Sequence, residues 1–246
     1  LNLDDEEFYK YLEIAKKVGN WIYKRLSKLS KDRRESMWDT YIAGEFGGMN
    51  EAMVRLYKLT GEKRFLETAK MFDNDKLFVP MEEEKDVLEG FHANQHIPQV
   101  IGCMELFRET GEKRYYHIAQ YFWKIVTEYH RFVNGGVGDV EMFFGPNEES
   151  RHLTKDTAEY CVSYNMLKLT KELYEYDLDV KYMDYYERTM FNHILPGFTH
   201  ETNGETTYFY PLAPGSFKDS KIINSCCHGT GMESQMKYTE SIYYHR

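Results

Sequence analysis

The sequence predicts an all-α protein built from stacked pairs of helices. Apolar residues recur at three- and four-residue steps through the first 29 positions, which is typical of an amphipathic helix. A ten-residue segment recurs 50 positions later, and each copy joins two helical patterns through a glycine. A weaker third copy follows in the second half of the chain.

The first helix is predicted within residues 4–29. Its apolar side chains repeat with helical spacing and define the side that should face the protein interior: Phe8, Leu12, Ala15, Val18, Ile22, Leu26 and Leu29.

The repeat predicts successive helical hairpins. Residues 56–65 recur as residues 106–115, and residues 173–182 form the degraded third copy. In the two clear copies one helix ends at a glycine cap and the next begins at once, with Ala69 and Ala119 at matching places in the second helices. A period of about 50 residues is typical of a stacked array. An open α-solenoid and a closed α/α toroid both fit.

Residues 198–223 interrupt the helical pattern. Asn203-Gly204 precedes a β-branched and aromatic run, and Pro211, Pro214 and Gly215 then exclude helix. We expect a short β-hairpin excursion on the rim of the array, with the last helix resuming after Gly231.

The first helix of each pair opens with polar, glycine-rich sequence. These openings occupy residues 45–51, 90–96, 156–161 and 226–231. In a toroid, alternate helix starts would converge on one mouth, which is where a small ligand would bind.

The amino-acid composition argues against some classes of binding partner. Lys and Arg total 31 against 40 Asp and Glu, a net charge of −9, which argues against a nucleic-acid or anionic-membrane partner. The 21 Tyr, 15 Phe and 3 Trp suit stacking on sugar rings, although most should fill helix interfaces. No apolar run is long enough to span a membrane. Because the chain opens with Leu, we expect a fragment or processed form. Compartment and oligomeric state stay open.

Four cysteines are too few for a disulfide framework, and three of them suggest a metal site instead. A bond between Cys226 and Cys227 would close a strained ring, which leaves unrelated buried thiols or a shared metal. Glu159 and Cys161 can join them only at an irregular helix start, because residues two apart on a regular helix face apart. Three thiolates and a carboxylate suit zinc. Cys103, in an apolar helical stretch, is expected in the core.

These residues resemble a known family. Residues 135–138, Glu141, residues 157–161 and the Cys226–Cys227 pair resemble glycoside hydrolase families 127 and 146, the zinc-dependent β-L-arabinofuranosidases. Residues 45–51 and 92–94 are similar as well, so the resemblance covers essentially the whole chain. It implies an (α/α)6 barrel followed by β-sandwich domains. Residues 1–246 are then expected to form an incomplete toroid catalytic domain, without the family's earlier helices and β-sandwich.

The resemblance also implies roles. Glu159, Cys161, Cys226 and Cys227 would hold Zn²⁺, Cys226 would double as the nucleophile, and Glu141 would be the general acid/base. It further implies a retaining hydrolase of β-L-arabinofuranosides or related plant-glycan furanosides. The loop around Glu141 departs in length from the family type, and residues 228–231 look closer to family 146, so the sugar stays open.

Several assignments keep an alternative. His92 resembles a sugar-contacting histidine but also suits a helix start, and His96 is as well explained structurally. Glu45 and Asn50 either cap a helix or contact sugar. Tyr164, with Asn165, either lines the pocket or packs in the core.

Other functions also remain open. His228 is poorly placed to pair with the adjacent Cys227 as a catalytic dyad. An α/α-toroid hydrolase or lyase could use Asp139, Glu141 and Glu45 beside a structural zinc. Outside enzymes, an inactive carbohydrate-binding module fits as well.

Overall fold

The computed structural model describes residues 4–39, 46–198, 205–219 and 225–244. These residues are mainly helical, and their β structure consists of isolated antiparallel bridges. None of the described helices is long and apolar enough to cross a membrane. The α-helices are α1 (Asp5–Leu26), α2 (Lys31–Trp38), α3 (Met49–Thr60), α4 (Lys63–Lys70), α5 (Asp75–Glu82), α6 (Ala93–Thr110), α7 (Lys113–Tyr129), α8 (Tyr160–Asp177), α9 (Val180–Thr189) and α10 (Cys226–Gln235).

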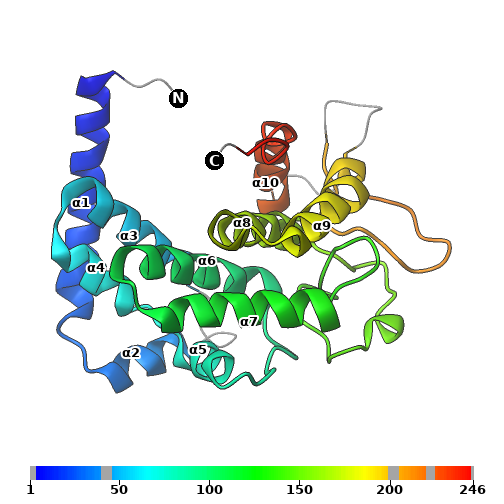
Figure 1. Cartoon of the computed structure of the whole chain (residues 1–246), viewed down its shortest axis with the longest axis horizontal. Coiled ribbons are helices and arrows are strands. Elements are labelled where there is room, and N and C mark those ends of the chain that lie inside the picture. The colour runs from blue at the N-terminus through cyan, green and yellow to red at the C-terminus, as the bar shows by residue number, and fades with distance from the viewer. Residues whose placement is uncertain (1–3, 40–45, 199–204, 220–224, 245–246) are drawn as a thin grey trace.

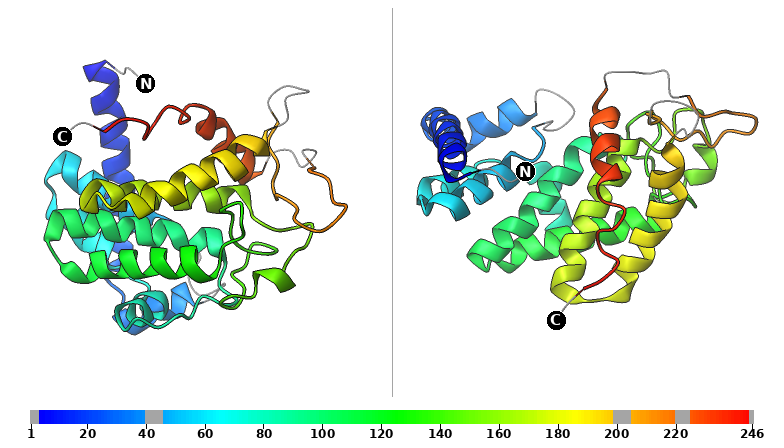
Figure 2. Two further views of the ribbon diagram at one scale, coloured as in Figure 1. Left: turned by 45° about the vertical axis from the view of Figure 1, so that its right-hand side comes forward. Right: turned by 90° about the horizontal axis from the view of Figure 1, so that it is seen from above.

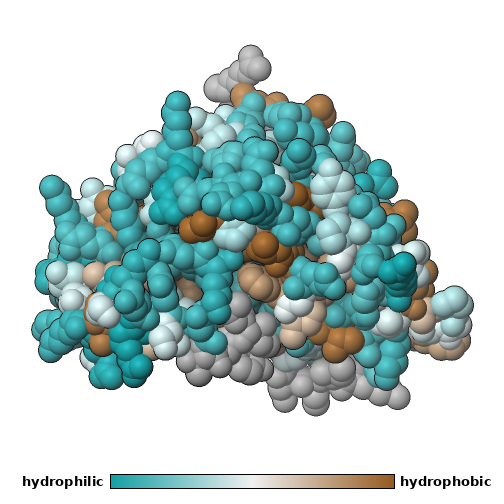
Figure 3. Space-filling model, turned by 90° about the horizontal axis from the view of Figure 1, so that it is seen from below, coloured by the Kyte–Doolittle hydropathy of each residue, from teal (hydrophilic) through white to brown (hydrophobic). Residues whose placement is uncertain are grey.

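The helices form successive pairs, as the repeat predicts. The pairs α3/α4, α6/α7 and α8/α9 follow one another across the molecule (Figure 2). The first members pack together in the order α3, α6, α8, and α10 packs on α8 (Figure 1). The prediction of an all-α array is therefore confirmed. Seen from below, the surface is mostly hydrophilic with scattered apolar side chains (Figure 3).

The repeated corners have the same structure. Gly61 and Gly111 end α3 and α6 with left-handed φ values of 69° and 71°, a conformation that favours glycine. Before each glycine a threonine hydroxyl donates to a carbonyl four residues earlier, at 2.7 Å in both corners. In the third copy Leu178 takes the left-handed position after α8, with φ 55°. The glycine is lost there, but the corner is kept.

A close contact joins α3 to α6. Asn50, at the start of α3, is fully buried, and its Nδ2 donates to the carbonyl of Gln99 at 2.8 Å. A Cβ at Gly102 would lie 2.2 Å from Asn50 Cγ, so only glycine at position 102 leaves room for the Asn50 side-chain amide. The amide of Asn50 is used in this packing and has no exposed surface to offer a sugar.

The prediction of which side of α1 faces the protein interior is partly wrong. Ile22 and Leu26 are buried as expected, together with Gly19. However, Phe8 is 38% and Val18 53% exposed. A second apolar stripe runs beside the buried one on this helix, and helical spacing alone does not tell the two apart.

The β excursion is reduced to bridges in the described residues. Phe198 pairs antiparallel with Thr206, and Phe209 pairs with Glu159. The expected turn at residues 203–204 lies outside the described residues. The last helix begins at Cys226, not after Gly231 as expected. Of the two glycines inside this helix, Gly231 has a packing reason, because a Cβ there would lie 2.3 Å from Thr206 Cγ2.

Candidate metal and catalytic site

The structure brings the four predicted ligands into one cluster. Ligand atoms of Glu159, Cys161, Cys226 and Cys227 all lie within 4.8 Å of one another. Two of these residues come from the start of α8 and two from the first turn of α10. The packing of α10 on α8 therefore assembles the cluster.

Glu159 and Cys161 lie at an irregular helix start, as the prediction of a shared metal requires. Glu159 is the N-cap residue, with φ −57° and ψ 133°, and Cys161 is the second helical residue. The non-helical backbone at Glu159 turns its side chain to the same side as the Cys161 sulfur. Ala158, just before it, has a left-handed φ of 51°, a strained conformation for a residue with a Cβ.

The neighbouring cysteines of α10 differ in exposure. Cys227 is buried, and its Sγ lies 3.8 Å from Glu159 Oε1. Cys226 is exposed, with its Sγ 4.0 Å from the same oxygen. Cys161 is buried, and its Sγ lies 3.3 Å from Thr230 Oγ1. Only Cys226, of these three thiols, presents its sulfur to a ligand from outside.

The donor set fits a zinc ion. Glu159 is 2% exposed, and its Oε2 is buried without a hydrogen-bond partner. Burial, with the charges of Cys226 and Glu141, raises the pKa of Glu159 to about 8. Hydrogen bonds from Cys161 and Cys227 lower the pKa of Cys226. A buried carboxyl that has one oxygen without a hydrogen-bond partner and lies among three sulfurs matches the four-coordinate, sulfur-rich sites that zinc prefers.

Glu141 reaches the site on a tight turn. Asp139 and Met142 exchange two backbone hydrogen bonds of 2.9 and 3.0 Å, and the two residues between them have positive φ, 47° at Val140 and 69° at Glu141. These features are typical of a type I′ turn, which usually takes Asn or Gly. The Glu141 carbonyl accepts from Ala93 N at 2.8 Å. The turn is thereby fixed to the start of α6.

Tyr208 links Glu141 to the cysteine cluster. Its hydroxyl donates to Glu141 Oε1 and lies 3.9 Å from Cys226 Sγ. Burial and the Glu141 carboxylate raise the pKa of Tyr208, so the hydroxyl keeps its proton. On the other side, His92 Nε2 lies 3.5 Å from Glu141 Oε2. The predicted Cys226, Glu141 and His92 are thus brought together.

Sequence reasoning missed Tyr208. It belongs to the aromatic run expected in the β excursion, and nothing in its spacing relates it to Glu141 or Cys226. The backbone of the same segment holds it in place, because Tyr160 N donates to Tyr208 O at 2.9 Å.

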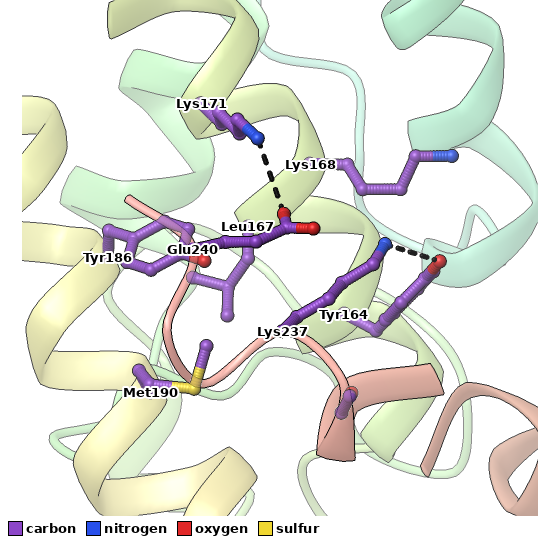
Figure 4. A pocket seen from close by; sticks show the side chains of 9 residues that line it. Tyr164, Leu167, Lys168, Lys171, Tyr186, Met190, Lys237 and Glu240 are labelled. Carbon is purple, nitrogen blue, oxygen red and sulfur yellow. Dashed lines mark hydrogen bonds and ion pairs between the residues drawn. The ribbon is translucent and has the colours of Figure 1, made fainter. Parts of the chain in front are cut away.

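The other predicted residues lie elsewhere. Tyr164 lines a separate pocket between α8 and the end of α10, where its hydroxyl accepts from Lys237 Nζ at 3.2 Å (Figure 4). Asn165 donates to Asn94 Oδ1 at 2.8 Å and joins α8 to α6. Glu45 lies outside the described residues. Cys103 is fully buried, which confirms its core role.

His96 and Asp139, the two other candidate functional residues, make contacts that suit structural roles. His96 is fully buried, and its Nδ1 lies 2.7 Å from the carbonyl of His92, which fits a structural role. Asp139 accepts from Thr154 Oγ1 at 2.6 Å and contacts His152 Nδ1 at 3.0 Å. Its two oxygens are thus engaged in holding the loop.

Comparison with solved structures finds the same fold. The GH127 β-arabinofuranosidase BT3674 matches 74% of this chain, at 21% identity and a TM-score of 0.60. Ara127N-Se, a GH127 β-L-arabinofuranosidase from Geobacillus stearothermophilus T6, matches 80%, at 19% identity and a TM-score of 0.62. A polysaccharide lyase matches 86%, at 14% identity and a TM-score of 0.52. The arrangement of helices is therefore that of helical toroid domains.

The matched region is only part of the first two proteins. It corresponds to 30% of BT3674 and 38% of Ara127N-Se, and to 67% of the lyase. A search of curated protein sequences finds no match. The family model described as the β-L-arabinofuranosidase GH127 catalytic domain matches residues 8–240. This match runs from within α1 to beyond the end of α10, and so the chain belongs to the GH127 catalytic-domain family.

Proposed function

We propose that Glu159, Cys161, Cys226 and Cys227 bind one zinc ion, and that this centre belongs to a retaining glycosidase acting on β-L-arabinofuranosides or related plant-glycan furanosides. The observation that carries the proposal is how the Cys226 thiol and the Glu141 carboxyl are arranged. Cys226 is the exposed thiol of the cluster, and Tyr208 connects it to the carboxyl of Glu141. A retaining glycosidase needs one nucleophile and one residue that acts as the general acid and then as the general base.

In the first step the Cys226 sulfur attacks the anomeric carbon. A C–S bond forms as the C–O bond to the leaving group breaks. Glu141 gives its proton to the departing oxygen, which leaves as an alcohol. Bound zinc would keep Cys226 deprotonated and stabilise its sulfur as a leaving group.

In the second step Glu141, now a carboxylate, takes a proton from water. The water oxygen attacks the anomeric carbon, the C–S bond breaks, and the electron pair returns to the Cys226 sulfur. Two displacements retain the configuration of the sugar. His92 lies beside Glu141 Oε2, where it can orient the carboxyl and contact a sugar hydroxyl.

The test compares cysteine variants on an aryl β-L-arabinofuranoside while bound zinc is quantified. We expect about one zinc per chain and retention of configuration in the parent protein. Cys226→Ser should lose about 10³-fold or more in rate, because its oxygen is a poor nucleophile and leaving group. Cys161→Ser should lose zinc and activity together. Cys103→Ala, in the core away from the cluster, is the matched control and should keep both.

Two outcomes would contradict the proposal. A Cys226→Ser protein that binds zinc and turns over near the parental rate would exclude the covalent role. A parent protein that binds zinc but cleaves no arylglycoside would favour the carbohydrate-binding alternative.

A further inference from the structure

A close contact lies beside the start of α8, between Gly136 and Ala158. A Cβ at Gly136 would lie 2.5 Å from Ala158 Cβ and 3.0 Å from His193 Nδ1. Unlike Gly135 and Gly138, Gly136 does not have a positive φ. Its backbone would therefore accept an alanine without strain, and a side chain is excluded there only by the neighbouring atoms.

Ala158 is the residue just before the cap of α8. It has a left-handed φ of 51°, and Glu159 after it has the non-helical φ of −57° and ψ of 133°. This irregular backbone turns the side chains of Glu159 and Cys161 to the same side, whereas residues two apart on a regular helix face apart. The conformation of Ala158 therefore determines whether the Glu159 carboxyl can reach the same metal ion as the three sulfurs.

The segments that precede Glu141 and Glu159 lie side by side in antiparallel orientation. Ala158 N donates to Gly138 O at 2.9 Å, and Val140 N donates across the same pair of segments at 3.0 Å. The proposed acid/base and a predicted metal ligand are therefore carried by directly paired chain segments. A change in the fit between these segments should reach both groups.

We propose that Gly136 and Ala158 are positioning residues for the candidate metal site. The missing side chain at Gly136 makes room for the Ala158 methyl group, and this fit holds the backbone that directs Glu159 toward the three cysteines. The inference rests on the proposed zinc site and extends it, because neither residue offers a side-chain ligand atom. It assigns to this pair of residues the task of keeping the start of α8 irregular.

An added methyl group at position 136 would have to displace one of its two neighbours. His193 is fully buried, and its Nδ1 lies 2.6 Å from Ser163 Oγ on α8, so the ring has little room to move. Ala158 is already strained, and its backbone can relax by leaving the left-handed region. We therefore expect the Ala158 backbone to move and to carry the Glu159 carboxyl away from the sulfurs. Loss of such support typically lowers metal affinity by about 10- to 100-fold.

The first experiment is a double-mutant cycle that is read out as zinc affinity, by competition with a chromophoric chelator. Gly136→Ala should lose about 10- to 100-fold in affinity. Ala158→Gly should bind zinc like the parent, because glycine adopts the left-handed conformation without strain. The variant with both changes should recover most of the loss, since the clashing methyl group is gone. Gly145→Ala is the matched control, because its Cβ would meet only the movable side chain of Glu148.

The second measurement replaces zinc by cobalt(II), whose visible absorption depends on the number and kind of its ligand atoms. In Gly136→Ala the spectrum should move toward that of Glu159→Ala, in which the carboxylate ligand is missing. The variant with both changes should return the parental spectrum. A protein that is merely destabilised would keep the parental spectrum in its folded fraction, which circular dichroism measures.

Parental zinc affinity and a parental cobalt spectrum in Gly136→Ala would overturn the proposal. A loss that the added Ala158→Gly change does not repair would overturn it as well, because the contact would then not be the cause. If Gly136→Ala does not fold, the variant with both changes decides: it supports the proposal by folding and binding zinc, and overturns it by failing. A parent protein without zinc affinity would instead refute the proposed zinc site, and this inference with it.

Discussion

At the residue scale, the site depends on how two side chains, Tyr208 and His92, hold the carboxyl group of Glu141. Glu141 receives a hydrogen bond from Tyr208 on one oxygen and faces His92 on the other. Tyr208 also contacts the Cys226 sulfur. A single phenol hydroxyl thereby fixes the distance between the proposed acid/base and the proposed nucleophile. Such positioning can contribute much of the rate of a reaction without any chemistry of its own.

Tyr208→Phe tests this positioning role. Removing the hydroxyl deletes a hydrogen bond to Glu141, which is a carboxylate in the second step, and we expect a loss of about 10- to 100-fold in kcat. KM and bound zinc should change little, because the ring and the metal ligands stay in place. Steady-state kinetics with zinc analysis measure both effects. Tyr210→Phe, two residues along the same segment, is the control. A Tyr208→Phe enzyme with full kcat would remove Tyr208 from the mechanism.

His193 gives the fold a dependence on pH. Complete burial lowers its pKa to about 4, while its Nδ1 lies 2.6 Å from Ser163 Oγ. The folded protein therefore keeps this ring neutral at pH values where the unfolded chain takes up a proton. Its contribution to stability is complete above pH 6.5 and is lost as the pH falls toward 4.

We therefore expect His193→Asn to flatten the acid limb of the stability profile. Between pH 7 and pH 5 the parent should lose about 2 kcal/mol more of its free energy of unfolding than the variant does. Urea unfolding at both pH values measures this difference. The other titrating groups are common to both proteins and cancel. Equal losses in parent and variant would show that His193 does not titrate in this range.

At the element scale, short irregular segments place the functional groups, and regular helices hold those segments. Glu159 sits at the non-helical cap of α8, Glu141 in the turn between Asp139 and Met142, and Tyr208 beside the bridge to Glu159. The turn at Val140 and Glu141 is strained, since both residues have positive φ. That strain is tolerated because the surrounding hydrogen bonds fix the turn to α6.

Val140→Asn should relieve part of this strain. Asn tolerates the left-handed conformation, so we expect the free energy of unfolding to rise by about 1 kcal/mol. The Val140 side chain is exposed, and its backbone N–H, which donates to Asp156 O at 3.0 Å, is kept. Chemical unfolding measures the change. Val133→Asn, at an exposed valine without positive φ, should have little effect. A destabilised Val140→Asn protein would contradict this account.

Much of this organisation could be predicted from the sequence. The glycines at positions 61 and 111 mark corners because they take left-handed φ. Three thiols with a carboxyl predict a metal site when their ligand chemistry is combined with the family resemblance, and the structure brings these four residues together. The start of α10 was misplaced because the glycines near Cys227 lower helix propensity, and close packing on Thr206 overrides that preference. Tyr208 could not be found, because its contact with Glu141 joins distant segments through an irregular chain path.

At the scale of the whole molecule, the cluster ties α10 to the array of helical pairs. The main helix contact of α10 in the described chain is with α8, and the four predicted ligands lie in that contact. Metal binding should therefore stabilise this end of the protein more than the α3–α6 end.

Chelation of the metal tests this dependence. We expect backbone amides of α10 to exchange hydrogen roughly tenfold faster or more after zinc removal, because a local opening then costs less free energy. Amides of α6 should change little, and zinc added back should restore protection. Hydrogen–deuterium exchange with mass spectrometry resolves both helices. Uniform acceleration across α6 and α10 would instead indicate that the metal supports the whole fold.

The separation of the ligands along the chain bears on the order of folding. Cys161 and Cys226 are separated by the rest of α8, all of α9 and the segment before α10. The helical pairs are closed by short corners and can form early, whereas the cluster must wait for a long loop to close. The Cys226 thiol would thus meet the other three residues of the cluster last, after the helical pairs have assembled.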